Sequence, residues 1–199
     1  HEDSTPMILF IGQVDMQFLG RGAFQEIDYA QMFGGIAKAV HQVRSAVDLP
    51  EIIQRAFALA VSGRPGPVVV ELPEDILFST VDHTLPASLS TDPVIPALVD
   101  VTEIGRALNS AKQPIVVVGG SRWSKKGLSD LRKFIHRYRL PVVAGFRRQD
   151  LFDNDDPLYA GMLGLAANPA LIQRVSDADV VLVIGSRLSE VTSNGYTLF

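Results

Sequence analysis

The stretch SGRPGPVVVELPEDI (residues 62–76) contains a turn, a strand and the end of that strand. The Pro-Gly-Pro turn at 65–67 is stiff, because proline fixes its own φ angle and glycine permits the change of direction. The three valines at 68–70 follow as a short, wholly apolar strand, and Pro73 ends it. A strand that is apolar on both faces is typical of a parallel sheet covered on both sides.

The residues before this stretch predict the other elements of a parallel layer. Met7 to Val14 (MILFIGQV) is a continuous apolar run, which predicts a strand buried on both faces. Residues 37–43 alternate well enough to predict a second strand. Between the two, Asp28 is placed to cap a short helix that ends near Gly34.

A longer helix is predicted over LPEIIQRAFALAVS (49–62), with Pro50 in its first turn. Residues 7–76 therefore alternate strand, helix, strand, helix, strand, as in a parallel α/β layer. The apolar residues of the long helix are expected to form one broad buried face, which comprises Ile52, Ile53, Ala56, Phe57, Leu59 and Ala60.

Residues 99–199 predict a second α/β module, which is doubly wound and Rossmann-like. Its first helix is expected to start with Asp100 as N-cap and Glu103 in a capping box. The proline-containing segment 77–98 has no sustained period and predicts a linker between this module and residues 1–76. The later elements are strands at 114–120, 140–146 and 179–188 and helices at 125–139 and 168–178.

The amino-acid composition narrows the class of protein, but it says little about which reaction the protein catalyses. The 199-residue chain is 47% hydrophobic and 20% charged with a net charge of −4, which is typical of a globular protein without a nucleic-acid partner. The absence of cysteine excludes disulfides, thiolate catalysis and cysteine-ligated metals. No apolar run approaches the roughly 20 residues of a membrane span, and no signal peptide is recognisable. We therefore predict no membrane partner and a cytoplasmic location.

Glycine follows three of the predicted strands, at the end where open parallel sheets bind ligands. A glycine there lets a phosphate approach the backbone, and the N-terminus of the next helix attracts negative charge. The alternative is a structural layer with solvated arginines, because neither a GxGxxG nor a Walker A motif is present. The candidate nucleotide-binding residues are Gly119, Gly120, Ser121, Arg147, Gly185 and Arg187, with further positive charge from Arg122, Lys125 and Arg148.

The remaining polar groups predict no metal site and no catalytic nucleophile. Asp153, Asp155 and Asp156 lack the glycine and distal glutamate of a calcium loop, which favours a solvated turn. The four histidines are scattered without metal-ligand spacing, and no GxSxG motif occurs.

The order of these segments resembles one enzyme family. HEDSTPMILFIGQV (1–14), GAFQEID (22–28) and the stretch at 62–76 are similar to the second half of the pyrimidine-binding domain of thiamine-diphosphate-dependent 2-oxo acid enzymes. The later segments, from KQPIVVVGGS (112–121) to the glycine- and valine-rich run at 159–188, resemble that family's middle domain. Acetolactate synthase is the nearest type, with benzoylformate decarboxylase and oxalyl-CoA decarboxylase as relatives.

The resemblance implies a parent enzyme that uses thiamine diphosphate with Mg²⁺. Its substrate would be a small 2-oxo acid or an acyl-CoA analogue, decarboxylated or cleaved through an enamine and often ligated to a second carbonyl compound. The cofactor carries the ylid chemistry, and the protein orients it. Active sites in this family lie between subunits, which implies a homodimer or homotetramer.

Two residues match the substrate side of acetolactate synthases. Phe24 and Gln25 correspond to the Phe-Gln pair of that family's FQE loop. A phenyl ring can form the wall of an apolar pocket, and an amide can orient a carbonyl group. The alternative is that Phe24 is a core residue and Gln25 caps a helix. Gln13, in GQV, also matches a common family residue, for which the sequence indicates only a structural role.

The predicted middle domain departs from the family's FAD-binding pattern. Acetolactate synthases hold FAD there, oxalyl-CoA decarboxylases hold ADP, and many members hold neither. The FAD-binding type carries GMHGT and GxRFDDR, whereas this chain has GLAAN (164–168) and GSRLSEV (185–191). Ala166 replaces the histidine and Val191 the last arginine. These departures argue against FAD, and they favour a less specialised decarboxylase or lyase over acetolactate synthase itself.

Both ends of the chain are expected to be truncated. The family's activating glutamate would precede His1, and its diphosphate- and metal-binding motif, GDG followed by Asn, would follow Phe199. The resemblance therefore implies no catalytic residue in this fragment and no activity of the fragment alone. The competing hypotheses are a stand-alone ADP- or FAD-binding module and a non-catalytic interaction protein.

Overall fold

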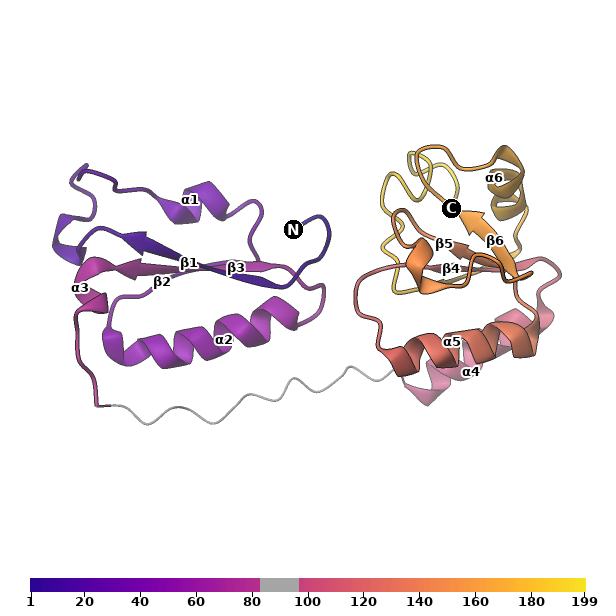
Figure 1. Cartoon of the computed structure of the whole chain (residues 1–199), viewed down its shortest axis with the longest axis horizontal. Helices are drawn as coiled ribbons and strands as arrows, with labels where there is room; N and C mark the ends of the chain where they lie inside the picture. Colours follow the sequence, from indigo (N-terminus) through magenta and orange to yellow (C-terminus); the bar gives the residue numbers. More distant parts are fainter. Residues whose placement is uncertain (83–96) are drawn as a thin grey trace. The chain divides into compact units, whose positions relative to one another are not determined.

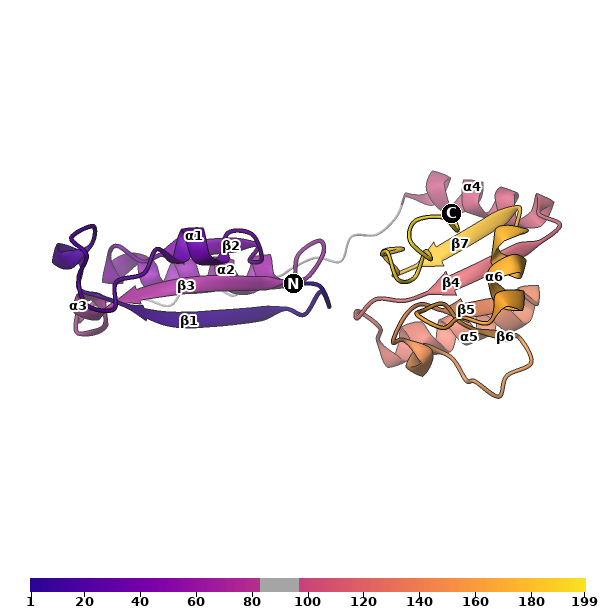
Figure 2. The ribbon, with the colours of Figure 1, turned by 90° about the horizontal axis from the view of Figure 1, so that it is seen from above.

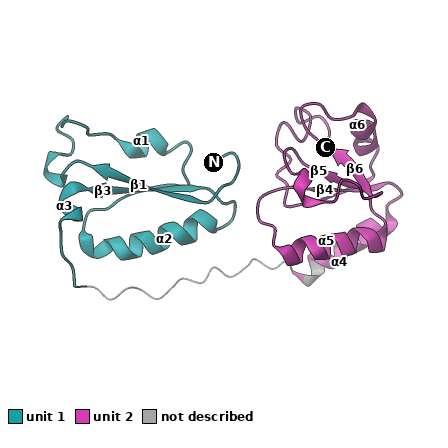
Figure 3. Cartoon of the chain, viewed as in Figure 1, with its two compact units in different colours: residues 1–93 teal, residues 94–199 magenta. Residues whose placement is uncertain are grey.

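The computed structural model describes residues 1–82 and 97–199, so most of the predicted linker at 77–98 lies outside the described residues. The chain divides into two compact units, His1–Pro93 and Val94–Phe199 (Figure 3). Each unit contains one sheet whose strands are all parallel, which confirms the predicted fold class. No helix in the described ranges is both long enough and apolar enough to cross a membrane.

The N-terminal unit contains β1 (Met7–Gln13), α1 (Tyr29–Phe33), β2 (Ala39–Gln42), α2 (Leu49–Val61), β3 (Pro67–Pro73) and α3 (Glu74–Leu77), with 3-10 turns at Met16–Phe18 and Ala46–Asp48. Its strand order is β1-β3-β2. The chain passes from β1 beyond β3 to β2 and then returns to β3. Because both crossovers are expected to be right-handed, they place α1 and α2 on opposite faces of the sheet (Figure 1, Figure 2).

The core of the N-terminal unit lies between β3 and α2. Val68 and Val70 on β3 are fully buried, and they form one cluster with Ala56 and Ala60 on α2. The predicted cap of α1 is also present, since the Asp28 side chain accepts a hydrogen bond from the backbone N–H of Gln31.

Two apolar surfaces of this unit are more exposed than the sequence predicts. β1 is not buried on both faces, because it is an edge strand on which Met7 and Phe10 are exposed. Among the described strands of this unit, only β3 has a neighbouring strand on each side, which explains why its residues are the most buried. Phe57 is likewise exposed, because a three-stranded sheet covers only a narrow stripe of α2 around Ala56 and Ala60.

The C-terminal unit contains α4 (Leu98–Ser110), β4 (Pro114–Val118), α5 (Lys125–Tyr138), β5 (Val142–Ala144), β6 (Tyr159–Met162), α6 (Pro169–Ser176) and β7 (Val180–Ile184), with a 3-10 turn at Gln149–Leu151. The strand order is β6-β5-β4-β7. The chain runs outward from β4 through β5 to β6 and then returns to the other side of β4. α5 and α6 therefore cover opposite faces, and the unit is doubly wound (Figure 1).

Successive residues of β4 supply the cores on both faces of this sheet, because side chains alternate along a strand. Val116 and Val118 belong to the cluster that includes Ile135 of α5. Ile115 and Val117 belong to the cluster that includes Leu171 of α6. The predicted buried strand at 114–120 is thus the centre of the unit.

Two local predictions for this unit are corrected. α4 begins earlier than expected, after Ala97, and has no side-chain cap, so Asp100 lies in the first turn instead of at the N-cap. A carboxylate in that turn still lies near the positive end of the helix dipole. β6 is missing from the prediction because it is short and contains Gly161, whose φ of 122° is readily adopted only by glycine.

Candidate functional site

The loop between β1 and α1 carries Phe24 and Gln25 at its tip. The Phe24 side chain is 88% exposed, so the alternative that it is a core residue is wrong. Gln25 does not cap α1, because Asp28 does. Gln25 has a φ of 67°, a left-handed conformation that costs a non-glycine residue about 1–3 kcal/mol. Such strained backbone is found preferentially at ligand-binding positions.

Glu26 holds the shape of this tip from within the loop. Its carboxylate accepts hydrogen bonds from the backbone N–H groups of Gly20 and Ala23, the latter at 3.0 Å. These bonds, that of Gly20 first, lower the pKa of Glu26 below its ordinary value. The carboxylate is therefore ionised near neutral pH and keeps both bonds.

Gln13 connects the same loop to the sheet. It is 7% exposed at the carboxyl end of β1. Its Nε2 donates to the carbonyl oxygen of Ile27 (2.7 Å), and its Oε1 accepts from the backbone N–H of Val14 (3.0 Å). The Tyr29 hydroxyl adds a second link by donating to the carbonyl oxygen of Gly12 (3.0 Å). This geometry gives Gln13 the structural role that its sequence position indicates.

The glycines predicted to bind a nucleotide meet where the neighbouring strands β4 and β7 end, the position at which doubly wound sheets bind ligands. A Cβ atom added to Gly120 would lie 2.1 Å from the carbonyl oxygen of Gly185, and one added to Gly185 would lie 2.6 Å from that of Gly119. The two loops are therefore in backbone contact. This contact explains the glycines without a ligand, since neighbouring protein backbone occupies the space next to them.

The other predicted nucleotide-binding residues lie on the surface of the C-terminal unit. Ser121, Arg147 and Arg187 are exposed. Arg147 has a φ of 61°, and its guanidinium carbon lies 4.9 Å from the ring centroid of Phe146. The fold thus brings the three glycines into contact and leaves the serine and the arginines exposed.

Two further residues at the carboxyl ends of the strands in this unit are absent from the sequence-based prediction. Trp123, the single tryptophan of the chain, donates its indole N–H to the carbonyl oxygen of Gly119 (2.7 Å). Thr192 is 5% exposed, and its hydroxyl accepts from the backbone N–H of Phe146 (3.4 Å). No motif marks Thr192, because its burial arises only from the path of the C-terminal segment.

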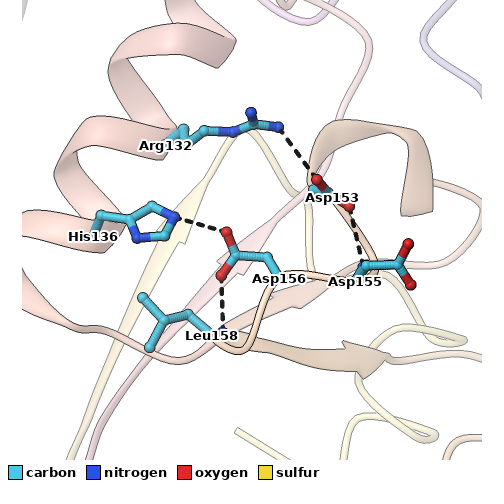
Figure 4. Close-up of polar contacts among 6 residues, drawn as sticks. All are labelled: Arg132, His136, Asp153, Asp155, Asp156 and Leu158. Atoms are coloured by element: carbon cyan, nitrogen blue, oxygen red, sulfur yellow. Dashed lines mark hydrogen bonds and ion pairs between the residues drawn. The ribbon is translucent and has the colours of Figure 1, made fainter.

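The acidic turn at 153–156 is held by local contacts (Figure 4). His136 Nε2 lies 2.7 Å from one carboxylate oxygen of Asp156, and the other oxygen accepts from the backbone N–H of Leu158 (2.9 Å). Arg132 lies 4.0 Å from the first aspartate of the turn. Across residues 1–82 and 97–199, no group of three or more histidine, aspartate or glutamate side chains could hold a metal ion.

Asp156 should make the stability of the C-terminal unit sensitive to acid. The Leu158 N–H and then His136 lower the pKa of Asp156 below 3.8. Its contribution is therefore complete above pH 3.8 and is lost as the pH falls through the lower folded-state pKa. As the pH is lowered from 5, we expect the Asp156→Asn variant to lose less unfolding free energy than the wild type. Urea titrations at steps of about half a pH unit measure this difference.

Asp155→Asn is the matched control for this experiment. At Asp155 the backbone N–H, and not the carboxylate, makes the contact within the turn (3.1 Å to Asp153 Oδ1). Parallel stability curves for the wild type and Asp156→Asn would show that Asp156 does not contribute.

Comparison with known proteins assigns the C-terminal unit to a family. Residues 101–199 match the family model described as "Thiamine pyrophosphate enzyme, central domain". Residues 101–199 are a thiamine pyrophosphate enzyme central domain. In this central domain, the loops after β4 and β7 are in contact at the carboxyl ends of the strands.

Nearly the whole chain, including the unit before the central domain, is homologous to acetolactate synthase large subunits. It is 31% identical over 197 residues to a probable acetolactate synthase large subunit of Methanococcus aeolicus, which covers 96% of this chain and 33% of that protein. It is 33% identical over 198 residues to the acetolactate synthase isozyme 3 large subunit of Escherichia coli K12. This match covers 96% of this chain and 34% of that protein. The chain spans about a third of the length of the curated relatives it matches. The predicted resemblance is confirmed.

Proposed function

We propose that this chain is part of a thiamine-diphosphate-dependent enzyme that acts on 2-oxo acids, by decarboxylation, carboligation or both, in the manner of acetolactate synthase. The observation that carries the proposal is homology to acetolactate synthase large subunits over 96% of the chain. The chain would supply the end of the pyrimidine-binding domain and the central domain of a cytoplasmic homodimer or homotetramer.

Phe24 and Gln25 are the proposed substrate-facing residues. Thiamine diphosphate with Mg²⁺ supplies the carbanion chemistry when bound. The Phe24 ring keeps water from the apolar side of the 2-oxo acid, and the Gln25 amide donates a hydrogen bond to one of its oxygens. The bonds of Glu26 hold this tip in place before substrate binds, which lowers the cost of ordering it.

The purified chain alone is proposed to be inactive. The chain spans about a third of the length of its curated relatives, so we assign no complete active site to it. We expect no turnover of pyruvate or benzoylformate in the presence of thiamine diphosphate and Mg²⁺. Measurable turnover by the 199-residue chain would contradict this part of the proposal.

A chimeric enzyme tests the substrate-facing role directly. The chain replaces the homologous third of the E. coli isozyme 3 large subunit, and acetolactate formation from pyruvate is measured. We expect Phe24→Ala and Gln25→Ala each to lower kcat/KM by about 10- to 100-fold. Phe57→Ala on α2 is the matched control, because Phe57 is another exposed phenylalanine of the same unit. Full activity of the Phe24 and Gln25 variants, or a folded but inactive chimera, would contradict the proposal.

Nucleotide binding by the central domain is the alternative function, and the glycine contacts do not favour it. The backbone of Gly185 fills the space next to Gly120. We expect FAD and ADP to leave the Tm of the central domain unchanged in thermal titrations of the chain followed by Trp123 fluorescence. A ligand at 100 times its Kd would stabilise the domain by about 2.7 kcal/mol. A saturable rise in Tm of that order would establish a nucleotide site.

A further inference from the structure

Asp75 lies where the central strand of the N-terminal unit ends. β3 is followed directly by α3, and Asp75 is the second residue of that short helix (Figure 1). The next residue, Ile76, is buried in the cluster that contains Val70 of β3, so the turn that carries Asp75 is anchored to the core. The Ser79 hydroxyl also donates to the carbonyl oxygen of Asp75 (3.0 Å). Asp75 therefore occupies a fixed position at the carboxyl end of the sheet.

The loop between β1 and α1 starts beside this position. β1 and β3 pair in a register that places Gln13 opposite Pro73, so the segments that follow the two strands emerge side by side. There the Asp75 carboxylate accepts a hydrogen bond from the backbone N–H of Met16 (3.2 Å). This bond joins the start of the loop to a segment 59 positions later in the sequence.

Met16 is the first residue of the 3-10 turn Met16–Phe18. The first N–H groups of a helical turn have no partner within the turn and need acceptors from outside it. The Asp15 carboxylate accepts from the N–H of Gln17 (3.0 Å), and the Asp75 carboxylate accepts from the N–H of Met16. Because Met16 is half-buried, the loss of its acceptor would leave a donor that water reaches only in part.

Further hydrogen bonds continue from this 3-10 turn to the tip of the loop. The backbone N–H of Arg21 is donated to the carbonyl oxygen of Phe18, the last residue of the turn (3.2 Å). The residue before it, Gly20, donates to the Glu26 carboxylate, which also accepts from Ala23. The position of the 3-10 turn therefore determines where the tip of the loop starts.

We propose that Asp75 is a positioning residue that fixes the start of the β1–α1 loop, and thereby the Phe24–Gln25 tip, through the N–H of Met16. Gln13 holds the end of the same loop at Ile27 (2.7 Å), so the tip lies between two fixed points. Calling the tip substrate-facing rests on the proposed function, whereas the bond between Asp75 and Met16 does not. Asp75 itself touches no substrate in this scheme.

Amide hydrogen exchange of the 199-residue chain, measured by NMR without substrate, tests the proposal. The Met16 amide reports on the bond itself, and the amides of Gly20 and Ala23 report on the tip. In Asp75→Ala we expect all three to exchange at least about tenfold faster, while the amides of α2 in the same unit are unchanged. Asp75→Asn keeps a side-chain carbonyl acceptor, so it should restore exchange to within about threefold of wild type.

Two further variants separate positioning from a general loss of structure. Glu74→Ala is the matched control, because Glu74 is the exposed neighbouring acid of α3, and it should leave the three amides unchanged. Met16→Pro removes the donor and leaves Asp75 in place, and proline is accommodated at the first position of a helical turn. It should accelerate exchange at Gly20 and Ala23 even if Asp75→Ala fails to fold. In the Met16→Pro background, Asp75→Ala should have no further effect on these two amides.

Two results would overturn the proposal: tip amides as protected in Met16→Pro as in the wild type, or exchange in Asp75→Asn as fast as in Asp75→Ala. The chimeric enzyme gives a separate readout, in which Asp75→Ala should lower kcat/KM by about tenfold and Asp75→Asn should restore it. Faster exchange at the tip with an unchanged kcat/KM would support the positioning role and count against the substrate-facing function of the tip.

Discussion

Replacing Gly120 by alanine should destabilise the central domain by about 2–5 kcal/mol. The new Cβ atom would lie 2.1 Å from the carbonyl oxygen of Gly185, which is backbone and cannot rotate away. Gly120 also has a φ of 74°, at which alanine is strained by about 1–2 kcal/mol. The loops after β4 and β7 would have to move apart. This movement would also disturb the hydrogen bond from the Trp123 indole to the carbonyl oxygen of Gly119. Urea unfolding followed by Trp123 fluorescence measures the effect, because this single tryptophan lies in the central domain.

Gly195→Ala separates backbone strain from collision. Gly195 lies in the same unit with a φ of 69°, but an added Cβ would meet no atom within 4 Å. We therefore expect Gly195→Ala to cost only about 1–2 kcal/mol. Equal losses in the two variants would mean that the contact between the loops contributes nothing to stability.

Replacing Ile135 by alanine should cost the central domain about 2–5 kcal/mol. Ile135 is fully buried on α5, in the cluster with Val116, Val118 and Val142. Truncation would leave a cavity between α5 and β4 that the surrounding strands, which are paired on both sides of β4, can fill only in part. Since a whole domain is stable by about 5–15 kcal/mol, a loss of this size should lower the urea midpoint substantially.

Ile104→Ala is the matched control for the cavity. Ile104 lies on α4 of the same unit and is 44% exposed. The same atoms are removed there without leaving an enclosed space, so a loss of about 1 kcal/mol or less is expected. Similar losses at Ile104 and Ile135 would contradict the packing described for α5.

Predictions from the sequence succeed where local chemistry and periodicity agree. The Pro-Gly-Pro turn and the valines at 68–70 mark β3, and it is the central, buried strand. Asp28 is an N-cap because its short side chain reaches the first free N–H groups of α1. Leu131 and Ile135 recur at helical spacing, and they face the core of the central domain.

What the sequence does not reveal depends on partners far away in the chain. The exposure of β1 follows from its place at the edge of the sheet, which an apolar run cannot indicate. The contact between Gly120 and Gly185 arises because two strands distant in sequence are neighbours. At the candidate site, the FQE motif locates Phe24 and Gln25, but the bonds that shape their loop require the fold.

The edge position of β1 has a consequence for handling the protein. Among the described strands, β1 and β2 pair only with β3, so each has one side of unpaired backbone N–H and C=O groups. Natural sheets protect such edges with charged residues or proline, and β1 (MILFIGQ) contains neither. A short, uncharged segment of high β-propensity with an open side is a template for intermolecular strand addition. The isolated chain should therefore aggregate as its concentration is raised. A charged substitution at an exposed position of β1, such as Phe10→Lys, should prevent this aggregation, which light scattering would measure.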